Sequence, residues 1–244
     1  MSAKTTIPIL ATQGVDGVVV RFSDTLTEPA NRAALALRAA LEGGAVPQVE
    51  EASSALASVY ARFGGDPTEG CRALAELLRE QNFETADLPM GCRRWTIPAA
   101  FGGRAGPAFE RVASEAGLSP EDALRDLTQT PIRVMAIGFA PGQPYLGRLP
   151  EAWDIPRLPE LTHVPAGAVV VAIRQLVLFT NASPTGWQHV GQTGFRTFRP
   201  DADRPFALAP GDEVSFRRVS EDDLDAIIAA DTTGDGGAVA ERLG

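Results

Sequence analysis

The stretch that most limits the fold is residues 138–147, GFAPGQPYLG. It follows the apolar run of residues 134–137, which is typical of a buried strand. Proline fixes the backbone angle φ and lacks an N–H, whereas glycine permits positive φ and a close approach of other groups. The stretch therefore predicts a stiff loop that carries the rings of Phe139 and Tyr145. Such a loop is either a preformed ligand surface or a tight turn with packed aromatic side chains.

A second rigid turn follows further along the chain. Residues 183–188, SPTGWQ, come after the apolar run of residues 176–179 and carry a tryptophan. Two aromatic-bearing turns on one β domain are expected to form the walls of a single cleft. Trp187 has a second interpretation as a plain core residue, because tryptophan is mostly buried in proteins.

The net charge and the distribution of apolar residues argue against several classes of partner. The 244-residue chain has a formal charge of −9, which argues against binding to nucleic acid or to an anionic membrane surface. No apolar run approaches the roughly 20 residues of a membrane span, and the N-terminus lacks the pattern of a signal peptide. Cys71 and Cys92 form no CxxC pair. A cytoplasmic protein is expected.

The side chains that most enzymes depend on are scarce. Lys4 is the only lysine, which argues against a phosphate-binding loop, a Schiff base or a biotin-carrying lysine inside the fold. The two histidines, His163 and His189, do not have the spacing of metal ligands, so no metal site is predicted. Ser183 has no evident base near it, and a serine triad is not expected.

The order of elements predicts an α+β chain in three parts. Residues 1–88 have the pattern of a small α+β domain, with a first helix capped by Thr27. Residues 82–92 are the expected linker, and residues 89–220 form a domain of short strands with dense turns, typical of a barrel. Residues 221–244 are expected to be a helix, capped by Ser220, and a flexible tail.

The second domain is expected to contain two short helices and seven strands, the first of which begins at residues 95–98. The helices are predicted at residues 107–116 and 120–127, the latter capped by Ser119. The other strands are predicted at residues 132–139, 168–173, 176–180, about 194–199, 205–208 and 213–219.

Two glycine-containing turns each have two interpretations. Gly102-Gly103 with Gly106 precedes a helix and either offers N–H groups to an anion or is a helix entry turn. Residues 231–236, DTTGDG, resemble half of a calcium loop but lack its closing glutamate, so a mobile acidic tail is expected there.

Several motifs in order resemble one family. The GFAPGQPYLG loop, the turn of residues 164–167, the SPTGWQ turn and the Pro-Gly-Asp of residues 210–212 are similar to the family of the bacterial 5-oxoprolinase B subunit. This family is also called allophanate hydrolase subunit 1 or KipI-like and contains a carboxyltransferase C-D domain. The resemblance implies a small N-terminal α+β sandwich domain followed by a cyclophilin-like β-barrel.

The resemblance also implies a protein that acts within a complex. In the family, the B-type subunit joins C-type and A-type subunits to hydrolyse 5-oxoproline to glutamate with ATP. A small lactam or amide substrate is therefore expected, with ATP bound at the level of the complex rather than by this chain alone. Two alternatives remain: a KipI-like inhibitor of a histidine kinase, and a carboxyltransferase component like that of urea carboxylase or allophanate hydrolase.

The expected substrate surface comes from the two turns and the segments around them. Arg157 offers a planar fork of donors for a carboxylate or is an ordinary surface arginine, and the N–H groups of Gly142 and Gly186 are expected to bind an oxyanion. No catalytic residue is assigned. The full set of expected substrate-binding residues is Gly138, Phe139, Pro141, Gly142, Pro144, Tyr145, Arg157, Pro165, Ser183, Pro184, Gly186, Trp187, Gln188 and Thr193.

The chain departs from the family pattern at several of these places. Gln143 stands where the family usually has Phe, Thr185 where it has Gly, Gln192 where it has Arg or Lys, and Leu127 where it has His. The family's Asn-Gln-Thr-Gly stretch is Arg-Gln-Leu-Val at residues 174–177. The changes indicate a divergent paralogue, which either acts on another substrate or has kept the scaffold without turnover.

Overall fold

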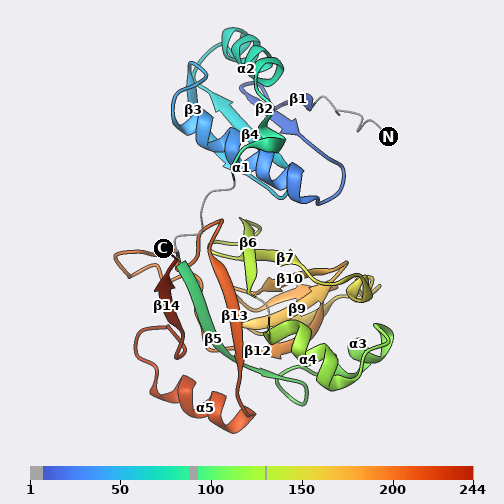
Figure 1. The fold of residues 1–244 in the computed structure, drawn as a ribbon. Coiled ribbons are helices and arrows are strands. Elements are labelled where there is room, and N and C mark those ends of the chain that lie inside the picture. The colour runs from blue at the N-terminus through green and yellow to red at the C-terminus, as the bar shows by residue number, and fades with distance from the viewer. Residues whose placement is uncertain (1–7, 88–92, 130, 244) are drawn as a thin grey trace. The chain divides into compact units, whose positions relative to one another are not determined.

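The computed structural model describes residues 8–87, 93–129 and 131–243 (Figure 1). The chain divides into two compact units, residues 1–90 and 91–244, which we describe separately. Lys4, Cys92 and part of the expected linker lie outside the described residues. Within the described ranges, every helix is too short or too polar to span a bilayer.

The first unit is an antiparallel sheet with helices on one face (Figure 1). The strands, in their order across the sheet, are β1 (Ile9–Gln13), β2 (Gly17–Arg21), β4 (Ser58–Phe63) and β3 (Val49–Ser54). The helices are α1 (Glu28–Glu42) and α2 (Thr68–Glu80), followed by the short η1 (Phe83–Thr85).

The first unit folds as its pattern predicts. The Thr27 hydroxyl accepts the Ala30 N–H and begins α1. Leu37 of α1 and Leu74 of α2 are fully buried against the alternate residues of β2 and β4 that face them. Phe83 of η1 completes this core, so the first residues of the expected linker belong to the domain.

The second unit is a closed barrel of seven strands, which confirms the predicted α+β class with a β-barrel. Around the barrel the strands are β5 (Arg93–Phe101), β13 (Glu213–Arg218), β6 (Ile132–Ile137), β7 (Pro144–Arg148), β10 (Gln175–Leu178), β9 (Ala168–Ala172) and β12 (Gln188–Gln192), and β12 pairs with β5 again. The helices α3 (Phe109–Glu115), α4 (Pro120–Thr128) and α5 (Glu221–Ala230) lie outside it, with η2 (Glu151–Trp153) in a loop.

The strand directions place particular segments together. β5 and β13 are parallel, whereas the other pairs in the barrel are antiparallel. The last residues of β5 and β13 therefore lie side by side, and the segment after β5 meets the start of α5 there (Figure 1). At another part of the rim, the start of β6, the end of β7 and the start of β10 come together.

The barrel has an inner and an outer apolar layer. The inner core includes Ile97, Leu146, Leu176 and Val214. The outer layer is a smaller cluster beneath the two-stranded ribbon of β8 (Thr162–Val164) and β11 (Ser183–Thr185), and its members are Val164, Ala168, Val170, Ala172, Val177, Phe179 and Trp187, with Tyr145 packed against them. We call this set the outer cluster.

Several expected strands and loops differ from the structure. Residues 194–199 and 205–208 are not strands and share only a single bridge between Phe198 and Phe206. The tail expected to be flexible contains β14 (Val239–Arg242), which pairs with β5. The reason is that β12 pairs only with the end of β5, so β14 covers the backbone groups along the first half of β5.

Candidate functional site

The two aromatic turns meet on the outside of the barrel. The ring centroids of Tyr145 and Trp187 lie 6.4 Å apart, with the ring planes inclined at 74°. This edge-to-face arrangement is favourable for aromatic rings. The two residues come from β7 and from the connection between β11 and β12, which β9 and β10 bring to one face.

The rings touch each other instead of facing one another across a hollow. Only 7% of Trp187 is exposed, because its indole packs in the outer cluster. Tyr145 is half-buried against the same cluster. The expectation of two rings as opposite walls of a cleft is therefore wrong, since burial of the large indole fills the space between the turns.

Arg157 lies over the tryptophan. Its Cζ atom is 5.0 Å from the centroid of the Trp187 ring, a cation–π arrangement. The neighbouring backbone fixes this position, because the Leu158 N–H donates to the Gly186 carbonyl at 2.6 Å and the Gln188 Nε2 donates to the Pro156 carbonyl at 3.1 Å. The exposed guanidinium is thus presented to solvent from a buried platform. Its planar fork suits a carboxylate.

The rest of the SPTGWQ turn is structural. Ser183 and Pro184 lie in β11, opposite Val164 and His163 of β8, and the exposed Pro165 follows β8 directly. The Ser183 hydroxyl donates to the Asn181 carbonyl.

Thr185 and Gln188 fix the two ends of the connection that holds Trp187. The buried Thr185 hydroxyl accepts the Trp187 N–H at 3.1 Å, which helps to shape the turn. The side-chain Oε1 atom of Gln188 accepts a hydrogen bond from Arg111 Nη2.

The opening loop is shorter than expected, because β7 begins at the buried Pro144. The Gly138 N–H donates to the Gln143 carbonyl at 3.0 Å and closes the loop. Phe139 is 77% exposed and has a φ of 72°, which is unusual for an aromatic residue. Pro141 is also exposed, so both side chains are available to a partner or ligand.

Gly142 is explained by packing. A Cβ atom at this position would lie 2.8 Å from the Thr197 carbonyl oxygen, and its φ of 73° favours glycine. The adjacent Gln143 side chain is buried, and its Oε1 atom finds no hydrogen-bond partner among the described residues. Gly142 therefore fastens the loop to the segment that follows β12, and this packing accounts for the residue without an oxyanion.

Thr193 and His189 lie in less accessible positions. Thr193 is 2% exposed, and its hydroxyl donates to the Pro98 carbonyl at 2.7 Å and accepts the Phe195 N–H. This placement argues against direct contact of Thr193 with a ligand. Burial lowers the pKa of His189 below its ordinary value, so the imidazole is neutral at pH 7.

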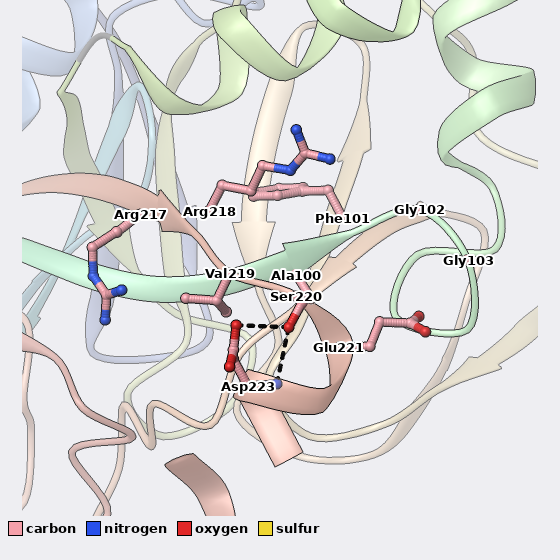
Figure 2. Close-up of a pocket in the computed structure, with 10 residues that line it drawn as sticks. All are labelled: Ala100, Phe101, Gly102, Gly103, Arg217, Arg218, Val219, Ser220, Glu221 and Asp223. Carbon is pink, nitrogen blue, oxygen red and sulfur yellow. Dashed lines mark hydrogen bonds between the residues drawn. The ribbon is translucent and has the colours of Figure 1, made fainter. Parts of the chain in front are cut away.

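A cavity of about 670 Å³ lies where β5 and β13 end, and Figure 2 shows its lining. The walls are the Gly102-Gly103 turn, the start of α5 and the arginines Arg217 and Arg218, which point in different directions from the end of β13. The double glycine was the only signal of this place in the sequence. Nothing local predicted that α5, more than 110 residues later, would meet it.

The anion held by this glycine turn is the chain's own Glu221. Its carboxylate accepts the Ala105 N–H at 2.7 Å and the Arg104 Nε–H at 3.0 Å. The hydrogen bond from Ala105 and the neighbouring Arg104 hold the pKa of Glu221 below its usual value. A Cβ atom on Gly103 would lie 2.8 Å from a Glu221 oxygen. The turn thus binds an anion, as one interpretation predicted, but an internal one.

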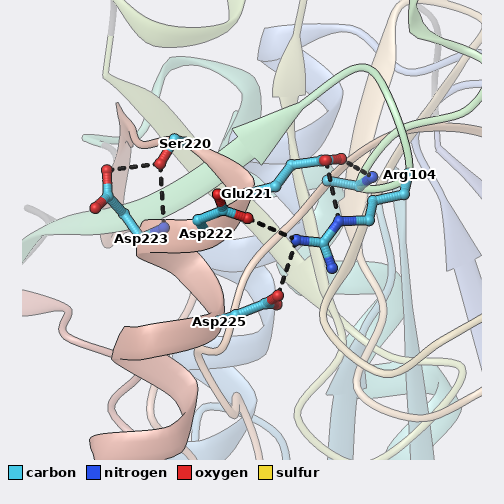
Figure 3. Close-up of polar contacts among 7 residues, drawn as sticks. Arg104, Ser220, Glu221, Asp222, Asp223 and Asp225 are labelled. Atoms are coloured by element: carbon cyan, nitrogen blue, oxygen red, sulfur yellow. Dashed lines mark hydrogen bonds and ion pairs between the residues drawn. The ribbon is translucent and has the colours of Figure 1, made fainter.

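Arg104 connects this turn to α5. Figure 3 shows its guanidinium among Glu221, Asp222 and Asp225, with the closest oxygen, on Asp225, at 2.8 Å. Three carboxylates around one exposed cation neutralise the positive charge of Arg104. The network fastens α5 to the barrel rather than offering a charge to a ligand.

The DTTGDG turn is ordered around Asp231. Burial raises the pKa of Asp231, but hydrogen bonds from the N–H groups of Thr233, Gly236 and Gly234 outweigh burial and lower it to about 2. No group of three or more metal-binding side chains occurs among residues 8–87, 93–129 and 131–243. The turn, expected to be mobile, instead shapes the chain between α5 and β14.

Comparisons with known proteins identify relatives over most of the chain. The family model described as "Carboxyltransferase domain, subdomain C and D" matches residues 8–208. A Bacillus subtilis (strain 168) protein, named as the B subunit of 5-oxoprolinase, is 31% identical over 224 residues, which cover 87% of this chain and 93% of that protein.

Two solved structures share the fold. The protein TTHA0988 superposes with a TM-score of 0.68 and 32% identity over 84% of this chain, which spans 40% of that protein. Kluyveromyces lactis urea carboxylase superposes with a TM-score of 0.74 over 97% of this chain and 24% of its own length, at 19% identity, so it shows the fold alone. The chain belongs to the carboxyltransferase subdomain C and D family, and its resemblance to the 5-oxoprolinase B subunit is confirmed.

Proposed function

We propose that the chain is the B-type subunit of an ATP-dependent 5-oxoprolinase complex, an amidohydrolase that opens a small lactam or amide. The observation that carries the proposal is the similarity to the Bacillus subtilis protein of that name, which extends over 87% of this chain and 93% of the relative. The remainder of the complex comprises A-type and C-type proteins, and the assembly works in the cytoplasm.

The substrate surface of this subunit is the stack of Arg157 on Trp187. A 5-oxoproline-like substrate carries a carboxylate, and an arginine fork binds a carboxylate through paired hydrogen bonds. The hydrogen bonds of the Leu158 N–H and the Gln188 side chain hold the backbone on both sides of Arg157 in place before the substrate arrives, which reduces the entropy lost on binding. The exposed Phe139 and Pro141 are available to the partner protein that completes the site.

ATP is bound by the complex through another of its proteins. Lys4 is the only lysine in the sequence, so a phosphate-binding lysine comes from a partner. In this proposal the chain positions the substrate, while the groups that activate the amide with ATP lie in the partner proteins.

A carboxyltransferase component is the second candidate. The family model is described as a carboxyltransferase domain, and the barrel superposes on urea carboxylase. This candidate requires a biotin-dependent carboxylase as partner. The genome neighbourhood separates the two: adjacent genes for A-type and C-type proteins favour the oxoprolinase, and an adjacent biotin-dependent carboxylase favours the carboxyltransferase.

Co-purification tests the assignment. Tagged chain is expressed with the products of its neighbouring genes, and ATP hydrolysis by the isolated complex is measured with a panel of lactams and amides. We expect hydrolysis that depends on 5-oxoproline or a close lactam. A complex that instead carries biotin and consumes bicarbonate would favour the carboxyltransferase, and a stable complex with a histidine kinase would contradict both.

A further inference from the structure

A second cavity, of about 550 Å³, lies at the rim of the barrel where β6 begins and β7 ends. Four arginines line it: Arg125 of α4, Arg133 of β6, Arg148 of β7 and Arg174 of the turn between β9 and β10. We call this cavity the arginine basin. The four residues are up to 49 positions apart in the sequence and meet only because the barrel closes.

The described lining of the basin has more arginines than carboxylates, in a chain that is negative as a whole. Among the described residues of the lining, Asp126 is the single carboxylate, and it accepts the indole N–H of Trp153 at 2.8 Å. Arg125 also forms an ion pair with Asp122, which is outside the lining. The formal charge of the chain is nevertheless −9. A concave surface lined by charges of one sign concentrates the electrostatic field and attracts oppositely charged ligands.

Arg174 occupies a strained backbone position. Ile173 and Arg174 have φ values of 46° and 65° in a tight turn between two antiparallel strands. Turns of this kind favour Asn and Gly, and a β-branched residue such as isoleucine is strained there. Strain of this kind gathers at functional sites.

Hydrogen bonds hold the strained turn in place. The Arg174 N–H donates to the Trp153 carbonyl at 3.0 Å, and the Leu149 N–H donates to the Arg174 carbonyl at 2.7 Å. The Arg174 Nε–H donates to the Leu149 carbonyl at 3.1 Å. A carbonyl is neutral, so the bond orients the guanidinium without cancelling its charge. Arg174 is therefore positioned at the basin before any ligand binds.

We propose that the arginine basin binds a small, multiply charged anion of the phosphate class, either a pyrophosphate or a phosphate ester. Guanidinium forks bind phosphate oxygens in pairs, and the described lining contains four arginines and one carboxylate. The volume is within the range of small-ligand pockets, and Leu149 and Pro150 supply an apolar wall for the body of an ester. The site is distinct from the Arg157–Trp187 stack and does not depend on the proposed oxoprolinase role.

Titration calorimetry on the full chain at low ionic strength tests this site. Pyrophosphate is the probe for the phosphate class, and succinate is the carboxylate ligand with which it is compared. We expect pyrophosphate to bind with one-to-one stoichiometry and more tightly than succinate. Arg174→Asn should weaken pyrophosphate binding by at least about tenfold, the loss expected for one charge-assisted bond.

Three comparisons separate binding from folding. Asparagine tolerates positive φ, so Arg174→Asn should retain or raise the melting temperature while losing affinity. Ile173→Asn relieves the same strain without changing the charge, and its affinity should equal that of the wild type. Arg217→Gln removes an exposed arginine from the other cavity and should also leave the affinity unchanged.

Several results would overturn the site. Undetectable binding of pyrophosphate to the wild type would exclude it. Equal affinity for pyrophosphate in the wild type and Arg174→Asn would place the anion elsewhere. Equal losses of affinity in Arg174→Asn and Arg217→Gln would mean that the effect comes from the overall charge of the chain. Tighter binding of succinate than of pyrophosphate would overturn the phosphate class.

Discussion

Arg157 lies over the face of Trp187, with its Cζ atom 5.0 Å from the ring centroid, while Tyr145 meets the same indole edge to face. The three residues come from separate segments, and only the arginine is exposed. The tryptophan is therefore a buried platform, and the arginine above it is the group that a ligand can reach. This division of roles leads to different predictions for the two residues.

Replacement of Arg157 should affect substrate binding and leave the fold intact. In the assembled complex, Arg157→Gln is expected to raise the KM for 5-oxoproline with a smaller change in kcat, because a carboxylate contact is made in both the ground and the transition state. Steady-state kinetics check this, with Arg217→Gln as the matched surface control. Identical KM values for Arg157→Gln and the wild type would remove Arg157 from the substrate surface.

Replacement of Trp187 should affect stability first. Trp187→Ala leaves a hole in the outer cluster and is expected to lower the free energy of unfolding by about 3–5 kcal/mol. Urea denaturation measures this loss. Trp187→Phe keeps an apolar ring and should lose less. If Trp187→Ala were as stable as the wild type, the indole would not be part of the core.

Gly142 and Gly138 lie in the same loop and should respond differently to the same change. Gly142→Ala would place a methyl group 2.8 Å from the Thr197 carbonyl oxygen at a positive φ, so we expect a loss of about 1–3 kcal/mol. A Cβ atom on Gly138 meets nothing within 4 Å, so Gly138→Ala should change stability by less than about 0.5 kcal/mol. Chemical denaturation of both variants is the check, and equal losses would contradict the packing described here.

The DTTGDG turn should make stability depend on acidic pH. The folded-state pKa of Asp231 is about 2, below the ordinary 3.8, so its contribution is fully present above pH 3.8 and is lost as the pH falls toward 2. Melting temperatures of the wild type and Asp231→Asn should therefore differ most near pH 5 and converge only as the pH falls through about 2. A difference that stayed constant over this range would mean that the carboxylate charge has no role.

Helix ends were the most predictable feature of the fold. Thr27, Ser119 and Ser220 were predicted as caps, and each hydroxyl accepts an N–H from the first turn of its helix. Capping depends on residues three positions apart, so the sequence contains the whole signal. The predicted barrel was also confirmed. It was predictable because short apolar strands with dense turns recur along the sequence of the second domain.

The short strands and the site contacts were not predictable in the same way. β11 contains Pro184 and, within the described part of the chain, pairs with β8 alone, and β7 begins with Pro144. Proline normally argues against a strand but is tolerated at edges and strand starts. The contact between Tyr145 and Trp187 and the meeting of the four arginines of the basin depend on barrel closure between distant residues. Local patterns do not show which strands far apart in the sequence become neighbours.

The role of this chain in an oxoprolinase complex is tested most directly by leaving it out. The A-type and C-type proteins encoded beside it are incubated with 5-oxoproline and ATP, with and without this chain, and the glutamate formed is measured against the ADP released. We predict that glutamate forms only when this chain is present. Full turnover in its absence would contradict the proposed function.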